Sequence, residues 1–110
     1  TTLMKFTIPP ATLDSLMKNA GVAKPKKADV FTLSASGGRV SVEFHGEVSA
    51  IVAPIRSEGA VKLIAKNFRA MLDTYKRTPE LTFEGGADGL KINNLKIPIQ
   101  EWIANPPNVS

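Results

Sequence analysis

The sequence contains no cysteine, which excludes disulfides, thiolate metal sites and cysteine nucleophiles. Its single histidine, His45, leaves too few imidazoles for a histidine-based metal site. We therefore expect no metal centre and no cofactor. The lack of cysteine also fits a reducing intracellular compartment.

Long apolar runs are absent as well. None approaches the roughly 20 residues that cross a bilayer, and the start of the chain has no basic segment followed by an apolar stretch of signal type. We expect a cytoplasmic protein with no membrane partner. Thr1–Leu3 precede Met4, and we interpret these three residues as an addition ahead of a natural start at Met4.

Aromatic residues make up only 6% of the sequence. The five phenylalanines all fall on apolar faces of the expected elements, at positions 6, 31, 44, 68 and 83. A single-strand binder that stacks bases needs exposed aromatic side chains, so the sequence argues against that function.

The size and composition are those of one globular domain. Hydrophobic residues account for 43% of the 110 positions and charged residues for 22%. We expect a single domain over residues 1–110, with 105–110 as a tail. Fourteen Lys and Arg against ten Asp and Glu give a net charge of +4, which favours a polyanionic partner if the excess is clustered.

The first half of the chain predicts a strand, a helix and a β meander. Met4–Ile8 alternates apolar and polar residues until Pro9-Pro10, and Thr12 is the expected cap of a helix of about ten residues that Gly21 stops. Gly37-Gly38 predicts a tight hairpin turn. The apolar face of the meander is expected to hold Phe31, Leu33, Ala35, Val40, Val42, Phe44, Val48, Ala50 and Val52.

The second half repeats this order loosely. Ala60–Ile64 reads as a short strand, and apolar residues at helical spacing continue to Tyr75, with Pro79 as the far limit of that helix. Later strands follow, turning at 85–89 and at Asn93-Asn94. Pro98 places the last of them at a sheet edge, and Trp102 and Ile103 are expected to close the core.

Hairpins, rather than single strands, separate the two helices. The sequence therefore predicts an α+β domain in which two short helices pack on one face of mainly antiparallel β meanders.

Two segments resemble the first domain of bacterial DNA sliding clamps, the polymerase III beta-subunit family. The first is Met4-Lys5-Phe6-Thr7-Ile8 followed by a short helix. The second runs from Glu58 to Ile99, with a strand ending Val61-Lys62-Leu63-Ile64, a helix over 65–72 and then Pro79-Glu80-Leu81-Thr82-Phe83-Glu84. The order of elements matches over nearly the whole chain.

The resemblance implies a DNA-clamp-like domain, a pseudo-symmetric unit of two helices against two small sheets. In that family six such domains close a ring around duplex DNA, the helices line the hole and strand edges pair across domain boundaries. It implies a non-catalytic processivity factor in DNA replication, with duplex DNA bound without sequence specificity, a homo-oligomer and a DNA polymerase as partners. A bacterial clamp subunit has three such domains and this chain has one, so an excised domain, a self-assembling relative and a relative without a ring all remain open. The family's pocket for polymerase peptides lies in later domains and is not carried over.

The candidate DNA-binding residues come from a basic loop and a basic stripe. The resemblance places Lys24 near DNA and Lys66 at the early basic position of the second helix, with Arg69, Lys76 and Arg77 as weaker matches. Spacing alone puts one stripe along the second helix if Lys62 lies close to its start, with the members Lys62, Lys66, Arg69, Asp73 and Lys76. The full set is Lys24, Lys26, Lys27, Lys62, Lys66, Arg69, Lys76 and Arg77.

Each of these signals also has an ordinary interpretation. Exposed helix faces are routinely charged, and a lysine-rich loop can simply be a solvated loop. His45 and Glu43 are interpreted as ordinary surface residues rather than as an acid and base pair, because nothing supplies a nucleophile or a metal to go with them. Two hypotheses therefore rank above an enzyme. The first is a DNA clamp domain, and the second is a clamp-fold module that pairs with partners through its sheet edges without binding DNA.

Overall fold

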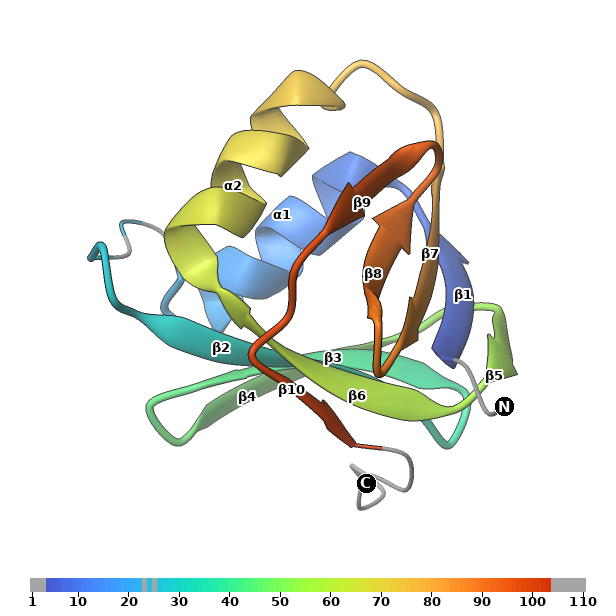
Figure 1. Ribbon diagram of the computed structural model, residues 1–110, viewed down its shortest axis with the longest axis horizontal. Coiled ribbons are helices and arrows are strands. Elements are labelled where there is room, and N and C mark those ends of the chain that lie inside the picture. The colour runs from blue at the N-terminus through green and yellow to red at the C-terminus, as the bar shows by residue number, and fades with distance from the viewer. Residues whose placement is uncertain (1–3, 23, 25, 104–110) are drawn as a thin grey trace.

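The computed structural model describes residues 4–22, 24 and 26–103. The expected addition at 1–3 and the expected tail at 105–110 lie outside these described residues. Two helices, α1 (Pro10–Asn19) and α2 (Ala65–Thr74), pack with two five-stranded antiparallel sheets (Figure 1). The predicted α+β class with antiparallel strands is confirmed, and the strands divide between two sheets.

Each sheet mixes strands from both halves of the chain. The first sheet has the order β5 (Ile55–Ser57), β1 (Met4–Ile8), β7 (Leu81–Gly86), β8 (Gly89–Ile92) and β9 (Leu95–Ile97). The second has the order β10 (Glu101–Ile103), β6 (Gly59–Ile64), β2 (Val30–Ser36), β3 (Arg39–Phe44) and β4 (Glu47–Val52).

The two halves of the domain exchange their first strands. β1-α1-β2-β3-β4 and β6-α2-β7-β8-β9 have the same order of elements, but β1 pairs with β7 and β6 pairs with β2. Neither half completes a sheet alone, so the loose repeat seen in the sequence becomes one interlocked unit.

Helix α1 starts earlier than the predicted cap. Pro10 occupies the first turn after Pro9, and no side chain caps the amino end, so the assignment of Thr12 as the cap is wrong. Proline suits this place because its fixed φ is helical and it has no N–H to satisfy. The predicted stop at Gly21 is confirmed: its φ is +91°, and the N–H of Val22 donates to the Met17 carbonyl at 2.8 Å.

Helix α2 follows β6 directly. The Ala65 N–H donates to the Asp29 carbonyl at 2.9 Å, which ties the start of α2 to the loop before β2. The helix ends at Thr74, five residues before Pro79. Because α2 begins only at Ala65, Lys62 lies inside strand β6. The prediction that it shares a helical stripe with Lys66 is wrong.

The core is organised around Phe68 of α2. Its ring packs edge to face on Phe31 of the second sheet at 5.1 Å between centroids, and it lies 6.1 Å from Phe83 of the first sheet. Phe83 in turn stacks on Phe6 of β1 at 4.9 Å. These aromatic contacts fix the position of α2 against both sheets.

Two of the sequence predictions concern strands at the sheet edges. β9 is an edge strand and ends just before Pro98, which confirms the edge prediction. The expected inward face of β4 is wrong: buried Val40 and Val42 pair with Ile51 and Ser49, so Val48, Ala50 and Val52 lie on the face away from the core. The short strands β5 and β10 were not predicted.

Candidate nucleic-acid interface

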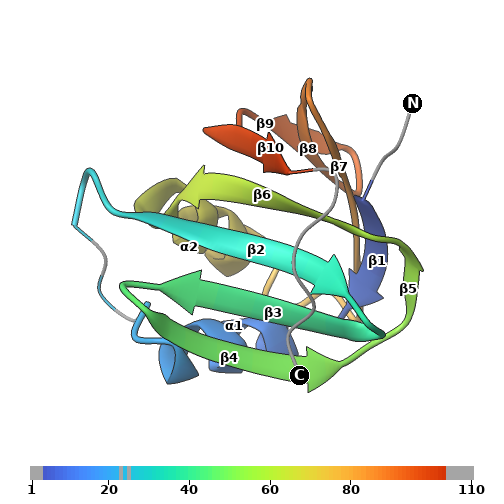
Figure 2. The same cartoon turned by 90° about the horizontal axis from the view of Figure 1, so that it is seen from below.

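Helices α1 and α2 form one layer on the inner side of the second sheet. Figure 1 shows both helices above that sheet, and Figure 2, seen from below, shows the sheet in front of them. The layer is joined by an ion pair in which Arg69 Nη1 of α2 lies 2.7 Å from Asp14 Oδ1 of α1. Lys18, one turn along α1, lies 3.1 Å from the other oxygen of Asp14.

Asp14 is thus held between two cations. Partial burial acts to raise its pKa, but the Lys18 ammonium and the Arg69 guanidinium outweigh that effect and keep the pKa of Asp14 below its ordinary value. The Arg69 side chain is only 19% exposed. Arg69 therefore holds the two helices together more than it offers charge to a ligand.

The net positive charge of the whole chain comes from this layer and the loops that follow its helices. Residues 10–29 and 65–80 carry eight Lys and Arg against four Asp and Glu, which is the entire excess of +4. The remainder of the chain has six residues of each sign. The positive excess is therefore confined to the segments that hold the two helices and the loops after them.

Six of the eight predicted basic residues are exposed at the ends of α2 or in the loop after α1. Lys66 is exposed in the first turn of α2, and Lys76 and Arg77 are exposed just beyond its other end. Lys24, Lys26 and Lys27 are exposed in the loop between α1 and β2, where the Lys26 N–H donates to the Asp29 carboxylate at 2.8 Å.

Lys62 does not belong to this surface. It alternates along β6 with the buried residues Val61 and Leu63, and so lies on the face of the second sheet away from the helices. Its ammonium is 4.0 Å from the carboxylate of Glu101 on β10.

Sequence reasoning missed two residues of the layer, Asp14 and Lys18. Their i, i+4 spacing was the available signal for an ion pair. The contact from Asp14 to Arg69 spans 55 residues of sequence and carries no local signal. A groove of about 260 Å³ runs between the helices here, lined in part by Asp14, Lys18, Arg69 and Lys76.

No metal-binding cluster occurs among the described residues. Within residues 4–22, 24 and 26–103, no group of three or more His, Asp and Glu is placed to hold a metal ion. His45 lies in the β3–β4 turn with φ of +50°, and its 71% exposed side chain is 3.9 Å from Asp29. No helix in this part of the chain is long and apolar enough to span a membrane.

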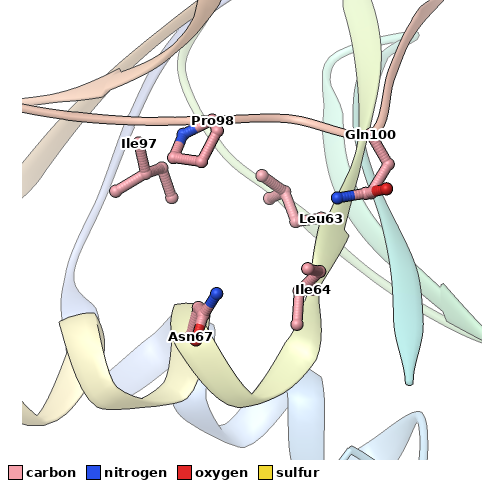
Figure 3. A pocket seen from close by; sticks show the side chains of 6 residues that line it. All are labelled: Leu63, Ile64, Asn67, Ile97, Pro98 and Gln100. Carbon is pink, nitrogen blue, oxygen red and sulfur yellow. The ribbon is translucent and has the colours of Figure 1, made fainter. Parts of the chain in front are cut away.

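A mostly apolar pocket of about 220 Å³ lies between α2 and the chain that follows β9. Figure 3 shows Ile97 and Pro98 on one side of it and Asn67 of α2 on the other. The Gln100 N–H donates to the Lys62 carbonyl at 2.7 Å and holds this stretch against β6. The pocket has no charged lining residue, so it offers room for an apolar side chain rather than for chemistry.

No family model and no curated protein matches the sequence. Among solved structures, the chain is similar to the beta sliding clamp of C. crescentus, with a TM-score of 0.64 and 17% sequence identity. The match covers 99% of this chain and 33% of that clamp, so the chain spans about a third of its length. The chain has a clamp-like fold.

Proposed function

We propose that this protein is a non-catalytic clamp-like domain that associates with duplex DNA through its helical layer and with copies of itself through its sheet edges. It would thereby serve replication as a processivity factor and hold a DNA polymerase near its template. One observation carries the proposal: residues 10–29 and 65–80 hold the chain's entire positive excess. The similarity in fold to a beta sliding clamp supports it.

The type and placement of the cations suit contact with phosphates that does not read sequence. Lys66, Lys76 and Arg77 are exposed, and they lie near the two ends of one helix. Lysine ammonium groups on long side chains act as point charges toward phosphate oxygens and carry no base specificity. Such contacts allow a protein to slide, because each one is weak and is replaced by an equivalent contact at the next phosphate.

Fluorescence anisotropy with two labelled duplexes of unrelated sequence tests the proposal. We expect weak binding at low salt, equal on both duplexes, with an affinity that falls steeply as salt rises, because released counterions drive the association. The absence of binding at low salt would overturn the proposal, and so would a marked preference for one duplex.

The second candidate is a module that pairs with a protein strand and does not bind DNA. The observation in its favour is the β4 edge, where Val48, Ile51 and Val52 are 47%, 38% and 77% exposed. Strand addition to a free edge is a common mode of peptide recognition. The same anisotropy measurement separates the candidates, since this one predicts no binding to either duplex.

A further inference from the structure

The four edge strands of the two sheets are not equivalent. β5, β9 and β10 have three residues each, whereas β4 has six. Within the part of the chain that the structure describes, β4 pairs only with β3 and has no strand on its other side. The second sheet therefore ends in one long edge on which another strand has room to add.

The hydrogen-bonding direction of β4 follows from its hairpin. A two-residue turn joins β3 to β4, with Phe44 opposite Glu47, so that pair exchanges both backbone hydrogen bonds. Alternation then points the N–H and C=O groups of Val48, Ala50 and Val52 to the free edge. By the same alternation, the backbone groups of Ala53 should point toward β3. The Ala53 N–H does so, since it donates to the Gly38 carbonyl across the hairpin.

The β9 edge is blocked by the same reasoning. Ile92 lies opposite Leu95 across a two-residue turn, so Leu95 and Ile97 point their backbone groups to β8. The next outward-facing positions are Lys96 and Pro98, and proline has no N–H to donate. A lysine and a proline are devices by which natural sheets protect an edge from pairing.

We infer that β4 is a docking edge for a second copy of this chain, which pairs antiparallel with it about a two-fold axis at Ala50. In this register Ala50 lies opposite Ala50 of the second copy, and Val48 lies opposite its Val52. All three residues that point their backbone groups outward thus meet equivalent groups that point back. A three-residue strand such as β9 would leave half of β4 without a partner.

The side chains and charges agree with this register. Val48, Ala50 and Val52 lie on one face of β4, so the pairing forms a continuous apolar row across the junction. On β3, Glu43 stands beside Val48 and Arg39 stands beside Val52. In the proposed dimer, each pair of Val48 and Val52 therefore has Glu43 of one copy on one side and Arg39 of the other copy on the other side.

A two-fold axis perpendicular to the sheet keeps the same face of both copies on the same side. The joined sheet would have ten strands, with both helical layers behind it. The inference rests on the self-association part of the proposed function, and it does not depend on whether the helical layer binds DNA, because only the β4 edge carries it.

Disulfide trapping gives the sharpest test, because the chain contains no cysteine. Hydrogen-bonded antiparallel neighbours have Cα atoms about 5.5 Å apart, which suits a disulfide. We expect Ala50→Cys to form a covalent dimer in high yield under mild oxidation, while Lys96→Cys on the β9 edge stays near the background level. Circular dichroism of both variants checks that the fold is retained.

Two outcomes would overturn the inference. In the first, Ala50→Cys stays monomeric while the double variant Ala50→Cys/Lys96→Cys forms a ladder of cross-linked species, which indicates head-to-tail pairing. In the second, the unmodified chain sediments as an 11.8 kDa monomer up to hundreds of micromolar. As a reversible companion test, Val48→Lys/Val52→Lys should weaken dimerisation at least tenfold, whereas Leu95→Lys on β9 should not.

Discussion

The carboxylate of Asp14 lies 2.7 Å from the guanidinium of Arg69, and this ion pair joins the two helices of the domain. The helices make few other direct contacts with each other, because each packs mainly against a sheet through its own apolar face. The pair thus links the two helices at the groove between them, which Asp14 and Arg69 both line.

Replacing Asp14 by Asn should destabilise the fold. The change leaves the mostly buried Arg69 guanidinium without its carboxylate, and we expect a loss of about 1 kcal/mol in the free energy of unfolding. Urea denaturation followed by circular dichroism measures the loss. Asp73→Asn is the matched control on the exposed face of α2, and equal effects of the two variants would contradict the account.

The contribution of Asp14 should depend on pH in a defined direction. Its pKa is lower in the folded protein than in the unfolded chain, so the ionised carboxylate stabilises the fold at neutral pH. This stabilisation is lost as the pH falls below about 4 and through the folded-state pKa. The stability gap between the parent chain and Asp14→Asn should therefore narrow steadily when unfolding is measured from neutral to acidic pH, and a gap that widens would show the sign to be wrong.

Gly59 should not tolerate a side chain. A Cβ at this position would lie 2.5 Å from Cη2 of Trp102 and 2.9 Å from Cβ of Met4. Gly59→Ala should cost about 1–3 kcal/mol and shift the emission of Trp102, the only tryptophan in the chain. Adding Trp102→Leu should recover part of the stability lost in Gly59→Ala, and a strictly additive double variant would place the strain elsewhere.

Local chemistry explains what the sequence predicted well. Gly21 ends α1 because the chain there needs a positive φ, and Gly37-Gly38 turns the β2–β3 hairpin with φ values of +61° and +76°. Pro98 marked an edge because it cannot donate to a ladder. Each of these assignments depends on one or two neighbouring residues.

Long-range pairing explains what the sequence did not predict. The inward side of β4 is set by its register with β3, and Ile51 on one face and Val48 on the other are equally apolar. Lys62 has the spacing of a helical residue, but β6 continues to Ile64 because β2 pairs with it along its whole length. β5 and β10 are three-residue strands that exist only through β1 and β6, so no local pattern indicates them.

The most direct test of the central claim compares two double charge reversals in the DNA-binding assay. Lys66→Glu/Lys76→Glu changes the helical layer, whereas Lys62→Glu/Lys91→Glu makes the same change of charge on strand faces directed away from the core. We expect the first variant to lose most of its affinity for duplex DNA and to lower the slope of log K against log salt by about 2. The second should bind nearly as the parent chain does. Equal losses in the two variants would show that net charge alone drives binding, and would contradict a DNA interface on the helices.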